Sequence, residues 1–245
     1  MQLAYEITGE GPLTIVLTHG LAASQATWAA QVAALAPRYR VLTWDLRGHG
    51  GSGPSEAPCT LGDLAGDLGE VLDRAGIERA VVLGHSAGGV VAMQFALDHP
   101  QRTAGLVLVG TASECNERAK QFYEDLAAIA ETRGMAPVNK RLGVGAEQAA
   151  QAPADPATFA RVARAMAGLN AAPLTPRLGE IHCPAQMIVG DKDFLGAGGS
   201  VILNRRIAGS RLTIVPERGH GIFVEDPAGF NAIVLSFLAD VSRPA

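Results

Sequence analysis

The chain has 245 residues, a formal net charge of −4 and a hydrophobic fraction of 48%. This length fits one α/β domain with an insertion and is sufficient to bury a full hydrophobic core. The small negative charge and the absence of basic clusters argue against a nucleic-acid partner.

Targeting and redox features point to one compartment. Met1–Pro12 contains neither a basic segment nor an apolar one, so we expect no signal peptide. No apolar run approaches the ~18 residues that span a bilayer, so we expect no membrane association. Cys59, Cys115 and Cys183 are scattered and odd in number, which fits reduced thiols better than a disulfide framework. The sequence therefore predicts a cytoplasmic protein, and it leaves the oligomeric state unknown.

Strand and helix patterns alternate along most of the chain. The helix expected after Ser24 places Trp28 and Leu35 on one face, and the helix expected after Thr60 begins with a capping-box pattern in which Asp63 replaces Glu. The predicted strands are Leu3–Thr8, Leu13–Thr18, Tyr39–Trp44, Ala80–Leu83, Gly105–Val109, Ala185–Val189 and Arg211–Val215. This alternation with short connections predicts an α/β fold, a mostly parallel sheet flanked by helices on both faces.

The alternation stops in the middle of the chain. From about Ser113 to Leu178 the sequence has only helical patterning, with a second helix expected to begin at Asp155-Pro156. Two apolar stripes are predicted there: Phe122, Leu126 and Ile129, and then Phe159, Val162, Ala163 and Met166. We therefore predict a core of residues 1–112 and 179–245, with residues 113–178 as an inserted helical subdomain.

One stretch carries the clearest chemical signal. The apolar run from Ala80 leads into Gly84-His85-Ser86-Ala87-Gly88, and a small-residue apolar run follows. A turn of about two residues would put Ser86 at a strained apex, with Oγ exposed and the positive end of a helix beside it. The alternative is a chance match of a turn to the Gly-x-Ser-x-Gly pattern, and the flanking strand and helix favour the nucleophile.

A serine hydroxyl needs a base within hydrogen-bond reach and an acid that orients the base. Asp191 and Asp193 lie just past a predicted strand, at the end where open α/β sheets gather their sites. His220 lies in a glycine-flanked loop after the last predicted strand. Ser86, one of the two aspartates and His220 are therefore the candidate catalytic residues.

Several motifs in order make the chain resemble the α/β-hydrolase fold family over nearly its whole length. They are His19-Gly20, the Asp-x-Arg-Gly-x-Gly-x-Ser loop of residues 45–52, the Gly84–Gly88 elbow, Gly190–Asp193, and His220 with Glu225 and Pro227. The resemblance implies Ser86, Asp193 and His220 as the triad, favours Asp193 over Asp191, and makes the insertion a cap or lid. It also implies an oxyanion hole formed by the backbone N–H groups of Leu21 and Ala87.

The remaining histidines and glycines suggest no further chemistry. His85 is an alternative base, but its side chain is expected to leave the top of the sheet on another side, and His19 is expected to brace the oxyanion loop. No His, Cys and Asp cluster has zinc-ligand spacing, and no P-loop or Rossmann pattern is present. We therefore expect no metal and no cofactor.

These residues predict a serine hydrolase that cleaves a carboxylic ester or lactone of a small-to-medium, partly apolar molecule through an acyl-enzyme. Among relatives, the chain resembles capped carboxylesterases and the enol-lactonase branch. The residues expected to contact substrate are His85, Phe122, Leu126, Phe159, Met166, Ile222 and Phe223.

Two other functions stay open. A C–C bond hydrolase of the meta-cleavage type shares the triad and lid, although such enzymes usually have Asn where this chain has His85. A small-molecule sensor that keeps the triad is the non-enzyme alternative. The sequence does not predict the natural substrate, because specificity depends on packing in the cap and the fold does not dictate it.

Overall fold

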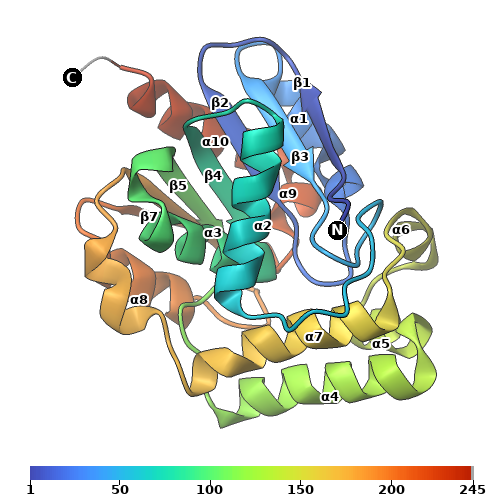
Figure 1. Cartoon of the computed structure of the whole chain (residues 1–245). Helices are drawn as coiled ribbons and strands as arrows, with labels where there is room; N and C mark the ends of the chain where they lie inside the picture. The colour runs from blue at the N-terminus through green and yellow to red at the C-terminus, as the bar shows by residue number, and fades with distance from the viewer. Residues whose placement is uncertain (244–245) are drawn as a thin grey trace.

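A seven-stranded sheet forms the centre of the computed structural model, which describes residues 1–243 (Figure 1). The strand order is β1-β3-β2-β4-β5-β6-β7, and all pairs are parallel except β1 with β3. The strands are β1 (Tyr5–Thr8), β2 (Thr14–Thr18), β3 (Arg40–Trp44), β4 (Ala80–His85), β5 (Thr103–Val109), β6 (Ala185–Gly190) and β7 (Arg211–Val215). The predicted mostly parallel sheet is confirmed, with strand ends that differ by one or two residues.

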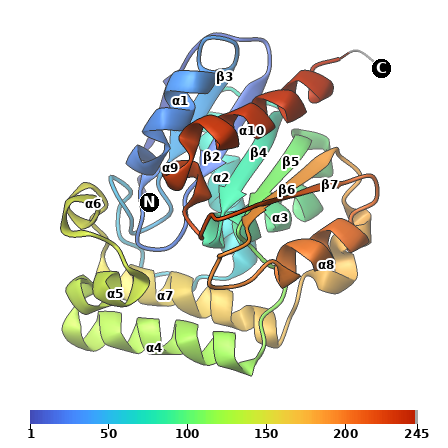
Figure 2. The same ribbon diagram turned by 180° about the vertical axis from the view of Figure 1, so that it is seen from behind.

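Helices cover both faces of this sheet. They are α1 (Ala29–Leu35), α2 (Leu61–Arg74), α3 (Ala87–Asp98), α4 (Glu117–Arg133), α5 (Met135–Leu142), α6 (Ala146–Gln151), α7 (Pro156–Ala167), α8 (Gly198–Arg206), α9 (Ile222–Glu225) and α10 (Pro227–Val241). Helices α2 and α3 lie on one face, and α1 and α10 lie on the other (Figures 1 and 2). Within residues 1–243, no helix combines the length and the apolar character needed to cross a bilayer.

Alternation along the strands builds two cores. Val16 and Val82 point to the core under α2 and α3, whereas Ile15 and Leu17 point to the core under α1 and α10. Successive side chains of a strand point to opposite faces, so a strand that is apolar throughout must be covered on both sides. All five residues of β2 are buried, as this arrangement requires.

Local sequence signals at the helix starts are mostly confirmed. Thr60 and Asp63 form a reciprocal capping box at α2, and the Asp155 side chain accepts a hydrogen bond from Thr158 N at the start of α7. The prediction that Ser24 caps a helix is wrong. Its Oγ donates instead to the carbonyl of Gln151 at 3.0 Å, and a 3₁₀ turn, Gln25–Trp28, precedes α1.

Helices α4 to α7 lie between β5 and β6 in the chain and above the carboxyl ends of the strands, with α4 alongside α7 (Figure 1). The predicted single stripe on α7 divides between two cores. Phe159 and Ala163 pack with Leu126 of α4, while Val162 and Met166 pack into the core under α2 and α3. Helix α7 therefore contacts the rest of the insertion on one side and the sheet domain on the other.

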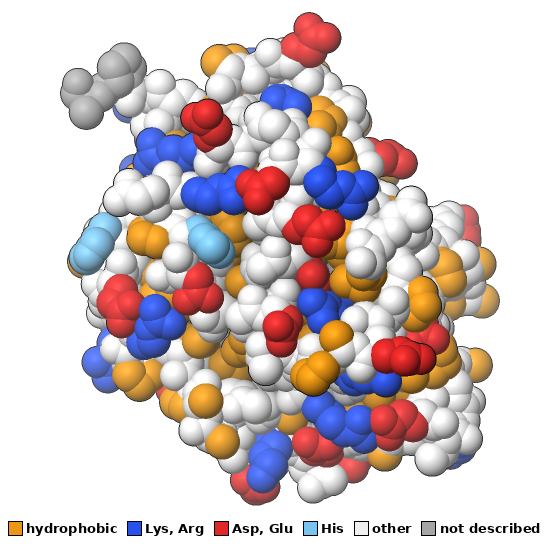
Figure 3. Space-filling model, viewed as in Figure 1, with side chains coloured by type: hydrophobic (Ala, Val, Ile, Leu, Met, Phe, Trp, Pro, Cys, Tyr) orange, Lys and Arg blue, Asp and Glu red, His pale blue; other side chains and the backbone are white. Residues whose placement is uncertain are grey.

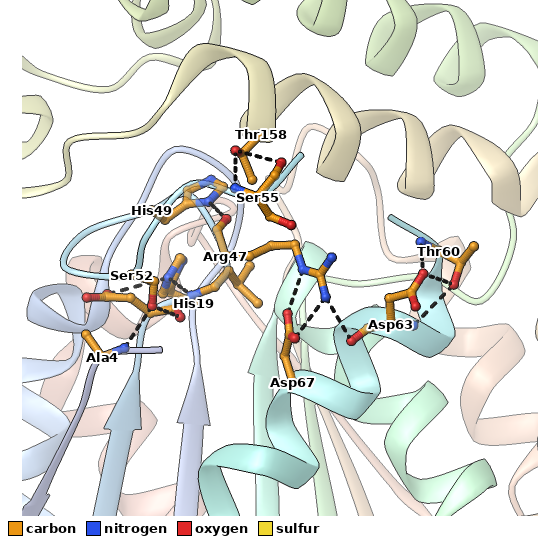
Figure 4. A network of polar contacts seen from close by, with 12 residues as sticks. Ala4, His19, Arg47, His49, Ser52, Ser55, Thr60, Asp63, Asp67 and Thr158 are labelled. Atoms are coloured by element: carbon orange, nitrogen blue, oxygen red, sulfur yellow. Dashed lines mark hydrogen bonds and ion pairs between the residues drawn. The ribbon is translucent and has the colours of Figure 1, made fainter. Parts of the chain in front are cut away.

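The loop after β3 joins the sheet, α2 and α7 through buried polar contacts (Figure 4). Arg47 donates to both carboxylate oxygens of Asp67 on α2, at 2.7 and 2.8 Å. Ser55 N donates to Thr158 Oγ1 on α7 at 3.0 Å, and Asp155 N donates to the carbonyl of Gly48 at 2.8 Å. These bonds attach the amino-terminal end of α7 to the loop that follows β3.

Two histidines in this network are neutral. His19 Nδ1–H donates to the carbonyl of Gly20 at 2.7 Å, and its Nε2 accepts from Leu46 N at 3.0 Å, an arrangement that only the uncharged ring can make. The His19 contact with Asp45, at 3.7 Å, is therefore not an ion pair. Burial lowers the pKa of both His19 and His49 from 6.5 to about 4.

This neutrality predicts a pH-dependent stability. Between about pH 6.5 and pH 4 the unfolded chain binds a proton at His49 that the folded chain does not, so the free energy of unfolding falls as the pH falls and is constant above that window. Comparing wild type with His49→Gln by urea unfolding, we expect wild type to lose about 3 kcal/mol relative to the variant between about pH 7.5 and pH 4. A difference that does not vary with pH would show that folding does not lower the pKa of His49.

Candidate active site

Ser86 occupies the sharp turn between β4 and α3, with φ 53° and ψ −119°. A Cβ on Gly84 would overlap the backbone of Gly88, and a Cβ on Gly88 would overlap the backbone of Thr18 and His19. Glycine is therefore required on both sides of the serine, because strand, turn and helix approach each other too closely for a side chain. The strained apex predicted for Ser86 is present.

Neighbouring strands fix this turn. Ser86 N donates to the carbonyl of Val109 at 2.9 Å, and Thr111 Oγ1 donates to the carbonyl of Ser86 at 2.8 Å. Both partners come from the end of β5 and the loop after it. The position of the Ser86 backbone is thus set by the sheet rather than by the loop alone.

Asp193 and His220 form a pair. His220 Nδ1 lies 2.9 Å from Asp193 Oδ2, and Asp193 Oδ1 accepts from Leu195 N at 2.8 Å. A carboxylate at Nδ1 holds the neutral ring with Nε2 as its acceptor, which is the tautomer that a general base needs. Asp193 is buried, whereas Asp191 is exposed. The structure therefore brings Asp193, and not Asp191, to His220.

Gly110 at the end of β5 was not singled out from the sequence, yet the pair depends on it. Its φ is +50°, and a Cβ there would lie 2.9 Å from Asp193 Oδ2 and 3.1 Å from His220 Nδ1. Only a residue without a side chain leaves room for the two groups to meet above this strand. The available signal was a glycine at the carboxyl end of a predicted strand, where α/β sheets place their sites.

A second carboxylate holds the histidine loop. Glu225 Oε2 accepts a hydrogen bond from Gly219 N at 2.6 Å, immediately before His220. Lys192 N donates to the carbonyl of Arg218 at 2.9 Å, which joins this loop to the one that carries Asp193. The two loops are therefore fastened to each other and, through Glu225, to the end of α9.

The predicted oxyanion groups lie beside the serine. Ala87 is the first residue of α3, where N–H groups have no partner within the helix. The loop that carries Leu21 passes over the turn: a Cβ on Gly20 would lie 3.2 Å from the Cβ of Ser86 and 3.1 Å from His85 Nδ1. Ser86 thus lies between a helix N-terminus and the loop after β2.

His85 faces the histidine loop. Its Nε2–H donates to the backbone carbonyl of His220 at 3.0 Å, and the two rings lie 4.6 Å apart. The edge of its ring meets Phe223, with centroids 4.8 Å apart. Burial and the neighbouring His220 lower the pKa of His85 well below its usual value. These contacts make His85 a support for the His220 loop.

A cavity of about 420 Å³ opens above Ser86, and its wall is largely apolar. Three residues expected to contact substrate, His85, Phe122 and Phe223, line it together with Leu21, Ser86 and His220. The sequence analysis missed other lining residues, namely Tyr123, Leu142, Val144, Phe194, Leu195 and Val224. Phe194 and Leu195 carried a usable signal in the sequence, since two apolar residues directly follow the candidate acid Asp193. In the structure both side chains are exposed.

Four residues expected to contact substrate lie elsewhere, which corrects that part of the prediction. Leu126 and Phe159 are buried between α4 and α7, Met166 faces the core under α2 and α3, and Ile222 packs with α1 and α10. Amphipathic spacing identifies the buried face of a helix but not what covers it.

A second cavity, of about 260 Å³, also reaches Ser86. Its lining includes Thr111, Ser113, Glu114, Cys115, Asn116, Tyr123, Leu169, Leu195 and Ile202. The loop between β5 and α4 (residues 110–116), the first turns of α4 and the start of α8 supply most of this wall.

Comparison with known proteins agrees with this geometry. A model described as the alpha/beta hydrolase fold matches residues 14–132. A protein from a Caulobacter species named "Putative carbamate hydrolase RutD" is 32% identical to this chain, and the match covers 97% of this chain and 96% of the relative. A protein of the same name from Variovorax paradoxus is 30% identical, and that match covers 100% of this chain and 98% of the relative.

Solved structures are similar over nearly the whole chain. A hydrolase from Pseudomonas aeruginosa is 30% identical with a TM-score of 0.88, covering 96% of this chain and 94% of its own. The enol-lactonase from Burkholderia xenovorans is 28% identical with a TM-score of 0.87, covering 97% and 96%. A thermophilic esterase from Thermogutta terrifontis is 27% identical with a TM-score of 0.89, covering 98% and 94%. The chain belongs to the α/β-hydrolase fold family and is a hydrolase.

The carboxylate at His220 predicts an asymmetry between two neighbouring aspartates. Asp193→Asn should lower kcat by on the order of 10⁴-fold, because an amide no longer fixes the tautomer of the imidazole. Asp191→Asn should leave kcat within about twofold, because Asp191 is exposed and does not contact His220. Ester hydrolysis by the two purified variants, with folding checked by circular dichroism, measures this. A larger loss of kcat in Asp191→Asn than in Asp193→Asn would show that Asp191 is the acid that orients His220.

Replacing two phenylalanines of the insertion, Phe159 and Phe122, should have different effects: one on stability and the other on substrate preference. Phe159→Ala removes a side chain that is 0% exposed and should cost about 3–5 kcal/mol of unfolding free energy. Phe122→Ala truncates a cavity wall and should instead change the preference among substrates by about 1–3 kcal/mol of discrimination. Urea unfolding and kcat/KM on an ester panel separate the two effects. If Phe122→Ala lowered the unfolding free energy as much as Phe159→Ala and left the substrate preference unchanged, the assignment of Phe122 to the cavity wall would be wrong.

Proposed function

We propose that the protein is a serine hydrolase that cleaves a carboxylic ester or lactone of a small-to-medium, partly apolar molecule through an acyl-enzyme. The observation that carries the proposal is that Ser86, at the apex of a strained turn, borders the same cavity as His220, whose Nδ1 is bonded to Asp193. A nucleophile, a base and an acid that orients the base are the groups with which a serine triad carries out acyl transfer.

In the first half of the reaction, His220 Nε2 takes the proton of Ser86 Oγ as the oxygen attacks the substrate carbonyl carbon. The oxygen of the tetrahedral intermediate accepts hydrogen bonds from the N–H groups of Leu21 and Ala87, each worth about 3 kcal/mol in the transition state. The bond to the leaving oxygen then breaks, and His220 returns the proton to the departing alcohol. Asp193 stabilises the imidazolium that forms in between.

In the second half, water enters and His220 removes its proton as the water oxygen attacks the acyl carbon. The tetrahedral intermediate again places its oxygen at Leu21 and Ala87. Collapse breaks the bond to Ser86 Oγ, which regains its proton from His220 and releases the acid. Residues 113–178 supply none of these groups, and we propose that this segment acts as the cap that selects the substrate.

The similar proteins support esters and lactones as substrate classes, and they add carbamates as a further class. Similar structures include an esterase and an enol-lactonase, and the RutD relatives are named for carbamate hydrolysis. A carbamate ester also offers a carbonyl carbon bearing an alkoxy leaving group, so the same residues could cleave it. Carbamate esters are therefore the second candidate substrate class. C–C bond hydrolysis and a sensor role remain alternatives that turnover of simple esters would disfavour.

Replacement of the nucleophile tests the proposal. Ser86→Ala should keep the fold and lower kcat on p-nitrophenyl esters, lactones or carbamates by on the order of 10⁴-fold or more. A fluorophosphonate probe should label wild type at Ser86 and leave Ser86→Ala unlabelled. A folded Ser86→Ala variant with near-wild-type hydrolysis would refute a serine mechanism.

A further inference from the structure

The two cavities described above meet at Ser86 but do not share its catalytic partners. Both are bordered by Ser86, Tyr123 and Leu195. Leu21 and His220 border the 420 Å³ cavity and do not line the 260 Å³ cavity. We name these the His220 cavity and the Tyr123 cavity. The nucleophile therefore has an open space on each side, and only one side holds the base and the oxyanion loop.

This division assigns the two halves of a substrate, given the proposed serine mechanism. The carbon under attack carries four groups: Ser86 Oγ, the oxyanion, the leaving oxygen and the acyl substituent. The oxyanion must reach Leu21 N–H, and the leaving oxygen must reach His220, so both oxygens belong on the side of the His220 cavity. The acyl substituent is the group left for the Tyr123 cavity.

We propose that the Tyr123 cavity is the acyl compartment and that it selects uncharged acyl groups carrying an oxygen that accepts a hydrogen bond, while it rejects acyl groups that end in a carboxylate. The leaving alcohol occupies the His220 cavity. This inference rests on the proposed serine mechanism and adds to it a class of substrate.

Tyr123 supplies the donor. Its side chain borders both cavities beside Ser86, and burial raises its pKa to about 12, so its hydroxyl stays protonated. In the described part of the chain, Tyr123 Oη has no hydrogen-bond partner. Neighbouring hydroxyls are already engaged: Thr111 Oγ1 donates to the carbonyl of Ser86, and Ser113 Oγ lies 2.7 Å from Thr175 Oγ1. Tyr123 is thus a residue with an unpartnered hydroxyl donor that borders both spaces next to Ser86.

The charge around the Tyr123 cavity is the basis for the expected rejection of acyl groups that end in a carboxylate. Within residues 1–243, Glu114 is the charged residue that lines the Tyr123 cavity, and no Lys or Arg lines either cavity. Glu114 is held in place, since its Oε2 accepts from Thr175 Oγ1 at 2.5 Å. The nearby Lys120 is paired with Glu117 at 3.0 Å. Glu114 is exposed, so a carboxylate in the acyl group would meet a like charge there and would find no cation among the lining residues.

Three p-nitrophenyl esters test this with one leaving group: valerate, levulinate and hemisuccinate. Levulinate and hemisuccinate have nearly the same shape, and they differ in a methyl ketone against a carboxylate. Each enzymatic rate is first corrected for spontaneous hydrolysis of the same ester, which in the hemisuccinate includes attack by its own carboxylate on the ester carbonyl. Each kcat/KM is then divided by the rate constant for alkaline hydrolysis, which corrects for differences in reactivity toward an oxygen nucleophile. We expect levulinate to exceed valerate about three- to tenfold, and hemisuccinate to fall about tenfold or more below valerate.

Matched variants identify the groups responsible. Tyr123→Phe should reduce the ratio of levulinate to valerate about three- to tenfold, whereas Tyr5→Phe, at a distant tyrosine bonded to the carbonyl of Arg74, should leave that ratio unchanged. Glu114→Gln should raise the ratio of hemisuccinate to valerate about threefold, whereas Glu78→Gln, at an exposed glutamate before β4, should not.

The outcomes separate this inference from the proposed mechanism. If wild type is labelled by fluorophosphonate but hydrolyses hemisuccinate best, or does not distinguish levulinate from valerate, the inference is overturned and the serine mechanism stands. If Tyr123→Phe folds and keeps the wild-type ratio, Tyr123 is not the donor and the inference fails. If wild type is neither labelled nor active on any ester, the mechanism fails and the inference with it. The wild-type comparison decides the matter even if a variant does not fold.

Discussion

The close approach of backbones around Ser86 is the constraint on which the rest of the site depends. A strand, a turn with φ 53° and a helix meet where neither Gly84 nor Gly88 has room for a Cβ. This strain persists because the sheet holds the turn from both sides, through Val109 on β5 and through the backbone of Thr18 and His19 at the end of β2. A parallel sheet brings the carboxyl ends of its strands to one edge, and the residues of the site come together at that edge.

Around this fixed point, loops that are distant in sequence are fastened to one another by hydrogen bonds. Asp193 meets His220, Glu225 holds the residue before it, and His85 bonds to its backbone carbonyl. The neutral His19 plays a similar part for the loop that carries Leu21, since both of its ring nitrogens are used to join backbone segments. Loops built this way keep polar side chains in register while leaving space for a substrate above them.

The inserted helices add walls but no catalytic groups. Helix α7 is tied to the loop after β3 and buried between two cores, so it forms the fixed part of the insertion. Helix α4 brings Phe122 and Tyr123, which are adjacent in sequence, to the space over Ser86. Tyr123 borders both cavities, and the lining of the Tyr123 cavity includes the side chains of Thr111, Asn116 and Glu114. In the proposed mechanism, the catalytic groups thus come from the sheet domain, while the insertion supplies part of the wall that contacts the substrate.

By itself, the sequence determined the strands, their mostly parallel arrangement, the turn at Ser86 and His220 as the candidate base, whereas the choice of Asp193 over Asp191 came from the family resemblance and the order of the strands came from the structure. The features that the sequence determined depend on local signals, such as β-branched runs, Asp-Pro helix starts and glycines at a tight turn, that act over a few residues. Which faces of the inserted helices meet solvent, core or substrate was decided by tertiary packing. Phe159 and Met166 have the same spacing as residues that could line a pocket, but each is covered by a different core. Gly110 matters because of Asp193, which is more than eighty residues away, and Tyr123 borders a cavity with Ser86, which is about thirty-seven residues away. These groups come together only in the folded chain. Sequence spacing shows which face of a helix is buried, but it does not show which residue will cover that face.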